Sequence, residues 1–212
     1  MKSKLPTDKI LSWFKQKSWQ PFAFQQEAWQ AYLDGKSGLI HSSTGSGKTF
    51  AIWPAPLMEW MAENSSKTVA PLTVLWLTPL RALAQDTAES LYDLVEGLEL
   101  TWTIEIRTSD TASSVKLRQK TKMPSCLITT PESLEVLLSY EEHQKQLKSL
   151  KLVVVDEWHE LLSTKRGSMT ELALARLRQL NPNLRVWGMS ATLSNLEESL
   201  KTLAQKFCSY IF

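Results

Sequence analysis

The sequence predicts an α/β domain in which helices cover both faces of a mainly parallel β-sheet. Short runs of β-branched and aliphatic residues alternate with longer amphipathic stretches along the chain of 212 residues. Repeated strand–helix units of this kind are typical of a parallel sheet buried on both faces. No internal repeat and no linker rich in Gly, Ser or Pro divides the chain. We therefore expect one domain.

Each predicted element follows from its local pattern. Pro131 suits the first turn of a helix, where its missing N–H would have no partner anyway. Pro54 and Pro56 fall inside a helical pattern, so we expect a kink or an early end there. The expected strands are Gly38–Ser42, Thr73–Thr78, Thr103–Arg107, Cys126–Thr129, Leu152–Asp156 and Arg185–Met189. The expected helices are Phe24–Leu33, Lys48–Ala62, Leu80–Val95, Val115–Lys122, Glu132–Tyr140, Thr170–Leu180 and Leu196–Lys206.

Composition excludes several classes of protein. An apolar fraction of 43% with 22% charged residues is globular composition, and a net charge of +2 gives no bulk basicity to recruit nucleic acid. Cys126 and Cys208 lie far apart without a CxxC pair, which indicates neither zinc nor a disulfide framework and favours a reduced, cytoplasmic setting. The longest apolar stretch, around Leu72 to Leu80, is too short to cross a bilayer, so we expect no membrane partner.

A small-residue loop joins the first predicted strand to the helical pattern at Lys48. Glycines at 45 and 47 allow successive backbone N–H groups to surround phosphate oxygens. Lys48 is then placed for the β- and γ-phosphates, and the Thr49 hydroxyl for Mg²⁺. Ser42 stands where the pattern GxxxxGK[ST] has its first glycine. The alternative is a plain turn before a helix, but the order of strand, loop and helix favours a phosphate site. Its residues would be Ser43, Thr44, Gly45, Ser46, Gly47, Lys48 and Thr49.

Two carboxylates follow the buried strand 152–156. Asp156 ends the strand, where it can hold Mg²⁺ opposite Thr49, usually through water. Glu157 is placed to orient and deprotonate the water that attacks the γ-phosphate. Acidic residues also favour the start of a solvated helix, which is the alternative for this pair taken alone. Together with the phosphate loop, the pair predicts a site for ATP and Mg²⁺.

Ordered segments along the chain resemble those of the superfamily 2 helicases and together cover nearly its whole length. Residues 156–167, DEWHELLSTKRG, resemble the Lhr-type branch of DEXH-box helicases, and residues 19–49 look most like the bacterial ligase-associated members. The segments are Gln25, SSTGSGKT at 42–49, TPLRALAQD at 78–86, RTSDT at 107–111, TTPESL at 129–134, DEWH at 156–159 and SAT at 190–192.

The resemblance implies roles in the nucleotide site. Gln25 would hydrogen-bond the adenine edge, and Trp19 or Phe22 would contact the ring, although core packing is the default for any one tryptophan. His159 would lie near the γ-phosphate with a catalytic role beside Glu157 and Lys48. The segment Ser190, Ala191 and Thr192 would couple nucleotide state to lobe movement.

The resemblance also implies contacts to a single strand through its phosphates. Hydroxyls, helix-start N–H groups and a guanidinium suit that task because they follow a backbone without reading bases. Ser109 stands where the family more often has glycine. Separately, Lys116, Arg118, Lys120 and Lys122 form a basic cluster whose default interpretation is a solvated helix face. The implied contact residues are Pro79, Leu80, Arg81, Arg107, Thr108, Asp110, Thr111, Thr130, Pro131 and Glu132.

Residues 1–212 are then expected to be a single RecA-like P-loop domain, the first lobe of a helicase. The chain ends 20 residues after Thr192, with a last strand near Tyr210, so we expect the second lobe and its arginine finger to be absent. An isolated lobe would hydrolyse ATP slowly if at all. The resemblance implies 3′-to-5′ movement on single-stranded DNA and a link to repair. RNA as the substrate, or a stand-alone nucleotide-dependent binding module, is the alternative.

Overall fold

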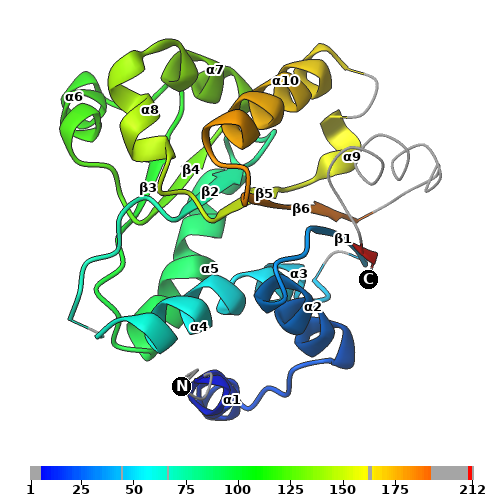
Figure 1. The fold of residues 1–212 in the computed structure, drawn as a ribbon. Helices are drawn as coiled ribbons and strands as arrows, with labels where there is room; N and C mark the ends of the chain where they lie inside the picture. Colours follow the sequence, from blue (N-terminus) through cyan, green and yellow to red (C-terminus); the bar gives the residue numbers. More distant parts are fainter. Residues whose placement is uncertain (1–5, 44, 66, 162–163, 192–209, 212) are drawn as a thin grey trace.

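A computed structural model describes residues 6–43, 45–65, 67–161, 164–191 and 210–211. Its centre is one seven-stranded sheet in the order β3-β4-β2-β5-β6-β1-β7 (Figure 1). Every pair of neighbouring strands is parallel. The strands are β1 Gly38–His41, β2 Val74–Leu77, β3 Ile104–Arg107, β4 Cys126–Thr129, β5 Leu152–Val155, β6 Arg185–Ser190 and β7 Tyr210–Ile211.

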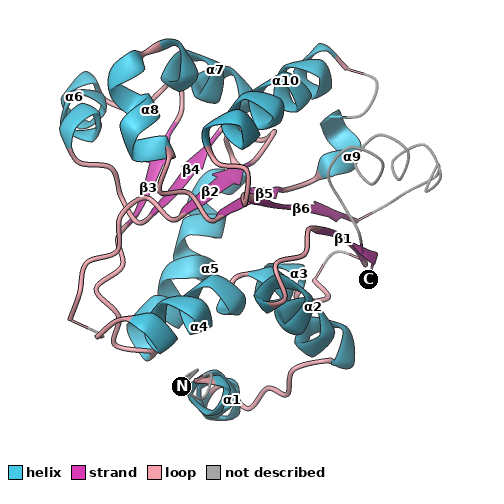
Figure 2. Ribbon diagram, in the orientation of Figure 1, coloured by secondary structure: helices cyan, strands magenta, loops and turns pink. Residues whose placement is uncertain are grey.

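Helices lie on both faces of this sheet, as the alternation of strands and helices predicts (Figure 2). Helices α1 to α5 cover one face and α7 to α10 the other, while α6 contacts β3. The helices are α1 Thr7–Gln16, α2 Ala23–Leu33, α3 Lys48–Ile52, α4 Pro54–Glu63, α5 Leu83–Gly97, α6 Ser113–Thr121, α7 Pro131–Ser139, α8 Glu141–Leu147, α9 Trp158–Leu161 and α10 Lys165–Leu180.

Two buried clusters form the core, one on each face. Successive strand residues point to opposite faces, so Val74 and Trp76 join the cluster under α1 to α5, whereas Leu75 and Leu77 join the cluster under α7 to α10. Both faces of the central strands are therefore apolar. This explains why their sequences are continuous apolar runs.

The carboxyl ends of neighbouring strands lie level with one another. The last residue of β4, Thr129, pairs with the last residues of its neighbours, Arg107 of β3 and Leu77 of β2. Leu77 in turn pairs with Val155, the last residue of β5. The loops that follow these strands consequently share one edge of the sheet, which is where ligands of such sheets bind.

The elements differ from expectation at several boundaries. The helical pattern from Lys48 divides at Trp53, because Pro54 and Pro56 cannot donate backbone hydrogen bonds. Helix α10 starts earlier than expected, where the Thr164 side chain accepts from Gly167 N–H. Helices α1, α8 and α9 were not expected. The expected helix Leu196–Lys206 lies outside the described residues.

Within the described ranges, no helix has both the length and the hydropathy that crossing a membrane requires.

Candidate functional site

The loop between β1 and α3 surrounds the Lys48 ammonium. Gly45 and Gly47 adopt left-handed backbone angles, with φ of 76° and 81°, which glycine accepts without a steric cost. Lys48 Nζ donates to the carbonyls of Ser42 at 2.8 Å and Ser43 at 2.9 Å. Burial lowers the pKa of Lys48, and the nearby carboxylates of Glu157 and Asp156 oppose that shift. Thr44 lies outside the described residues.

A cavity of about 330 Å³ unites the phosphate loop and the acidic pair. Strand β6 lies between β1 and β5 in the sheet, so the loops after β1 and β5 approach one another at its edge. The structure thus places the predicted residues Lys48 and Thr49 in one cavity with Asp156 and Glu157, which are distant in the sequence. The lining residues are Gly45, Gly47, Lys48, Thr49, Phe50, Ser90, Asp156, Glu157 and Met189.

Asp156 is the half-buried carboxylate that directly follows β5. Its Oδ1 accepts from Glu157 N–H at 2.9 Å and its Oδ2 from Trp76 Nε1–H at 3.4 Å. Burial, with repulsion from Glu157, raises the pKa of Asp156 to about 6. A carboxylate facing a hydroxyl across a polar cavity is a donor set that Mg²⁺ accepts.

Glu157 connects the acidic pair to the end of β6. It has a φ of 44°, which is uncommon for a residue other than glycine. His159 Nδ1 lies 3.4 Å from Glu157 Oε2 and 3.2 Å from Ser190 Oγ. Within the described residues, Glu157 Oε2 is buried without a hydrogen-bond partner. A buried polar atom of this kind at the cavity fits a site built for a polar ligand. Ala191 follows Ser190, and Thr192 lies outside the described residues.

A second cavity, of about 450 Å³, shares Gly45, Gly47 and Phe50 with the first. Gln25 is buried in its lining: its Oε1 accepts from Phe22 N–H at 2.9 Å, and its Nε2 donates to Gly47 O at 2.9 Å. Trp19 and Phe22 are 48% and 59% exposed, although Trp19 also packs edge-on against buried Trp13. The lining residues are Phe14, Trp19, Gln20, Phe22, Gln25, Gly45, Ser46, Gly47 and Phe50.

Three residues of this cavity, Phe14, Gln20 and Phe50, were not among the expected site residues. Phe14 belongs to α1, and its ring is 6.0 Å from that of Phe50 between centroids. Phe50 directly follows the phosphate loop in the sequence, and this position could have indicated that it lines the cavity. Phe14 carries no such signal, because only the packing of α1 against α3 and α4 brings it to the cavity.

The expected strand-binding residues all lie at or near the carboxyl edge of β2, β3 and β4. Leu80, Arg81, Asp110 and Glu132 are exposed, whereas Pro79, Thr108, Thr130 and Pro131 are buried and Thr111 is half-buried. The Thr130 side chain caps α7 by accepting from Ser133 N–H.

Arg107 differs from the other expected contact residues because its side chain is turned inward. It is 5% exposed, and its guanidinium faces Lys116 O and Gln119 Oε1, each at 3.4 Å. Burial lowers the pKa of Arg107. In this conformation the guanidinium supports α6 and does not reach the edge of the sheet.

Three residues of the basic cluster have partners inside the fold. Lys116 Nζ donates to Ser109 O at 2.8 Å, and Arg118 forms an ion pair with Glu105 at 2.9 Å. The Lys120 ammonium lies 5.3 Å from the centre of the Tyr140 ring. The cluster therefore serves largely to hold α6 and the loop before it in place.

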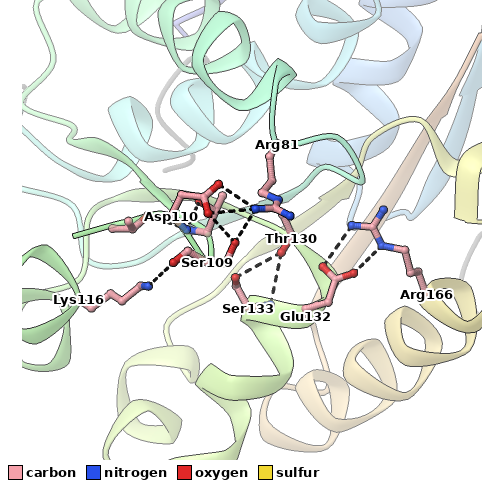
Figure 3. A network of polar contacts seen from close by, with 10 residues as sticks. Arg81, Ser109, Asp110, Lys116, Thr130, Glu132, Ser133 and Arg166 are labelled. Atoms are coloured by element: carbon pink, nitrogen blue, oxygen red, sulfur yellow. Dashed lines mark hydrogen bonds and ion pairs between the residues drawn. The ribbon is translucent and has the colours of Figure 1, made fainter. Parts of the chain in front are cut away.

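Two carboxylate–guanidinium pairs occupy the exposed part of the edge (Figure 3). Arg81 pairs with Asp110 at 2.8 Å, and Arg166 pairs with Glu132 at 2.5 Å. Arg166 was not among the expected site residues, since nothing in its local pattern distinguishes it from a helix-surface arginine.

The geometry defines an α/β domain with a phosphate loop, an acidic pair and a polar sheet edge. A family model described as DEAD/DEAH box helicase matches residues 22–199, and the chain belongs to that family.

Within the family, several of the similar proteins are Lhr helicases. The chain is 38% identical to the ATP-dependent helicase Lhr-Core of Methanocaldococcus jannaschii, covering 92% of this chain and 24% of that protein. It is 33% identical to the Lhr helicase/probable uracil glycosylase of Mycolicibacterium smegmatis, covering 91% of this chain and 13% of that protein. The chain thus spans a quarter or less of the length of these relatives.

A solved structure of Mycobacterium smegmatis helicase Lhr bound to ssDNA and AMP-PNP matches with a TM-score of 0.82 and 31% identity. The match covers 94% of this chain and 26% of that one. The helicase MrfA matches with a TM-score of 0.81 at 20% identity, a likeness of fold. The fold is that of a RecA-like helicase lobe.

Proposed function

We propose that residues 1–212 form the first RecA-like lobe of an ATP-dependent helicase that moves 3′ to 5′ on single-stranded DNA. The observation that carries the proposal is the single cavity lined by Lys48, Thr49, Asp156 and Glu157. The similar Lhr helicase that was solved with ssDNA and AMP-PNP supports it. The resemblance of residues 19–49 to ligase-associated helicases suggests a role in DNA repair, and such a role places the protein inside the cell.

In this proposal the cavity binds the triphosphate of ATP with Mg²⁺. Lys48, released from the carbonyls of Ser42 and Ser43, would contact the β- and γ-phosphates. Thr49 and Asp156 would hold Mg²⁺, which when bound neutralises developing charge on the phosphates. Glu157 would accept the proton of the attacking water. His159 contacts both Glu157 and Ser190. It would therefore couple the presence of nucleotide in the cavity to the segment 190–192.

The larger cavity would receive the nucleobase. Gln25 would offer its amide to the adenine edge, and the exposed rings of Trp19 and Phe22 would pack against the base. Gln25 already bonds Gly47 O, so adenine recognition and the shape of the phosphate loop would be linked through one side chain.

The strand would bind along the carboxyl edge of β2, β3 and β4. Phosphate contacts there need no base recognition. DNA and RNA have the same phosphates and differ in the sugar, so these contacts do not discriminate between them. Rapid hydrolysis would require a second lobe with an arginine finger, a contribution of about 10³–10⁵ in rate.

The test is Glu157→Gln in a protein that joins this lobe to a second one. We expect the variant to keep Mg²⁺–nucleotide binding, measured with a fluorescent ATP analogue, and to lose strand-stimulated hydrolysis by about 10²-fold or more. Glu141→Gln, which changes an exposed carboxylate of α8, should leave both unchanged.

Stimulated hydrolysis that survives Glu157→Gln would refute the role of that carboxylate. Oligodeoxynucleotides and oligoribonucleotides of one sequence are compared as activators. Stimulation by RNA alone would overturn the assignment to DNA.

A further inference from the structure

The expected strand-binding residues include two carboxylates, Asp110 and Glu132. A carboxylate repels a phosphodiester, so neither side chain suits a direct contact with a nucleic-acid backbone. Strand β4 lies between β3 and β2, which places the Glu132 segment between the loop of Asp110 and the loop of Arg81. Figure 3 shows that a guanidinium points toward each carboxylate.

The first pair leaves most of its guanidinium unused. Arg81 NH1 alone donates to both carboxylate oxygens of Asp110, at 2.8 and 3.0 Å, and to Ser109 Oγ at 2.8 Å. Ser109 Oγ also contacts Asp110 Oδ1 at 3.0 Å, and Lys116 holds the Ser109 carbonyl. Arg81 Nε and NH2 have no partner among the described residues. Serine, where a glycine is more usual, adds one of the contacts that fix this guanidinium.

The second pair is similar, but its arginine donates through different nitrogens of the guanidinium. Arg166 donates through Nε and NH2 to the two carboxylate oxygens of Glu132, at 2.5 and 3.2 Å. Its NH1 has no partner in the described part of the chain. The backbone of Arg166 is fixed by Thr170 Oγ1, which donates to its carbonyl at 2.9 Å. Both arginines are partly exposed, with side-chain exposures of 56% for Arg81 and 37% for Arg166.

We propose that Arg166 is a second phosphate-binding residue of this edge, and that Asp110 and Glu132 are positioning residues that orient Arg81 and Arg166. The proposal rests on the strand-binding role proposed above and deepens it. A guanidinium held by a carboxylate loses less conformational freedom when it binds a phosphate, and its free N–H groups match phosphate geometry. Each pair also neutralises the carboxylate that would otherwise repel the strand.

The opposing explanation is that these are ordinary surface ion pairs, which contribute little to stability, and that the carboxylates only repel the strand. The two explanations predict opposite signs. If Asp110 and Glu132 orient the arginines, then their neutral amides weaken strand binding. If the carboxylates only repel phosphates, then the same amides strengthen it.

The experiment measures binding of a fluorescent oligothymidylate to residues 1–212 by anisotropy over a range of salt concentrations. Arg166→Gln should raise the Kd about tenfold and reduce the magnitude of the log–log salt slope by about 0.7, the value for one phosphate contact to a single strand. Arg166→Lys should recover part of the affinity. The matched control is Lys17→Gln, which breaks an exposed ion pair with Asp93 between α1 and α5 and should change neither quantity.

Asp110→Asn and Glu132→Gln should each raise the Kd by about threefold or more without a change in thermal midpoint beyond that of the control. Tighter binding by either amide variant, or a salt slope unchanged by Arg166→Gln, overturns the inference. If Arg81→Gln weakens binding while Arg166→Gln does not, the inference fails and the strand-binding proposal stands. If the unchanged chain does not bind the oligonucleotide, both fail.

Discussion

Gly47 lies against the side chain of Gln25, and both residues line the larger cavity. Its φ is +81°, and a Cβ there would lie 2.7 Å from Gln25 Nε2. Gly45 has a similar φ of +76°, yet a Cβ there would meet nothing within 4 Å. Alanine at Gly45 therefore costs only the strained backbone conformation. Alanine at Gly47 adds a collision with the Gln25 side chain.

We predict that Gly45→Ala lowers the free energy of unfolding by about 1 kcal/mol, the cost of a left-handed alanine. Gly47→Ala should cost more and should also weaken binding of a fluorescent ATP analogue, because it displaces Gln25. Gln25→Ala removes the side chain that a Cβ at residue 47 would meet. In a chain that carries Gln25→Ala, Gly47→Ala should therefore lower the free energy of unfolding by less than it does in the unchanged chain. Equal effects of the two glycine substitutions would contradict this explanation.

The ionised carboxylate of Asp156 destabilises the folded chain when no nucleotide is bound. A pKa raised to about 6 means that the folded state binds a proton more tightly than the unfolded state does. Ionisation then opposes folding, by about 1.4 kcal/mol for every tenfold difference in proton affinity between the two states. The cost is absent below the unfolded value near 4, grows between pH 4 and pH 6, and is complete above about pH 6.

Asp156→Asn should therefore stabilise the nucleotide-free chain at pH 7.5 by about 2–3 kcal/mol. The amide keeps an oxygen that can accept from Glu157 N–H. Urea unfolding at several pH values checks this expectation. A gain that stays constant from pH 7.5 down to pH 4 would contradict it.

At this scale, sequence reasoning worked best where the backbone restricts the side chain. Asp156 directly follows the buried strand β5, and Lys48 begins the helix after the loop that follows β1. The order of strands in the sheet brings both residues to one cavity. The orientation of Arg107 could not be foreseen, because it depends on how α6 packs against β3. The pairing of Arg166 with Glu132 depends likewise on two helices that are distant in sequence.

At the scale of elements, direct contacts join the end of α9 to the start of α10. Thr164 Oγ1 accepts from Gly167 N–H at 3.1 Å and also contacts Leu161 O at 2.7 Å. A Cβ at Gly167 would lie 2.1 Å from the Leu161 carbonyl oxygen. A backbone atom cannot rotate away, so α9 and α10 would have to shift relative to one another.

We predict that Gly167→Ala lowers the free energy of unfolding by about 2 kcal/mol or more, whereas Thr164→Ala costs about 1 kcal/mol through loss of the cap. Chemical denaturation compares the two. Because α9 carries His159, Gly167→Ala should also weaken nucleotide binding. If alanine is tolerated at Gly167 without loss of stability, the contact between Gly167 and Leu161 is less restrictive than its distance indicates.

The strands were predicted more accurately than the helices. Cys126–Thr129 was predicted with its observed bounds, because an apolar run with β-formers has few other ways to bury both faces. Helix α1 was missed although Trp13 and Phe14 are buried, since those residues pack on elements far along the chain. Helix α8 is short and polar, with only His143 and Leu147 buried, and so offers little periodicity.

On the scale of the whole molecule, the two edges of the sheet have separate tasks. The carboxyl edge carries the cavity and the paired arginines. The opposite edge carries a half-buried ion network: Arg185, which begins β6, donates to both carboxylate oxygens of Glu59 at 2.9 and 3.0 Å. Tyr32 donates to Glu59 at 3.0 Å, and Lys151 lies 3.6 Å away. Glu59 thereby joins α2, α4 and the starts of β5 and β6.

Burial opposes the ionisation of Glu59, but the hydrogen bonds and charge of Arg185, with Lys151 and Tyr32, outweigh it and hold the pKa below its usual range. A lowered pKa contributes stability that is fully present above the unfolded value near 4.5 and is lost as the pH falls through the folded value. The network should therefore stabilise the fold at neutral pH and fail in acid.

Glu59→Gln should lower the free energy of unfolding at pH 7 by about 3 kcal/mol, because it leaves the Arg185 guanidinium buried without its counter-charge. Glu63→Gln is the matched control: its carboxylate, 59% exposed, pairs with the same Lys151, and its loss should cost no more than about 0.5 kcal/mol. The stabilities of Glu59→Gln and the unchanged chain should converge as the pH falls through the lowered pKa of Glu59. Nucleotide binding should be unaffected by Glu59→Gln under folding conditions, since the network lies at the far edge. A weakened affinity in the folded variant would show that the two edges are energetically coupled across the sheet.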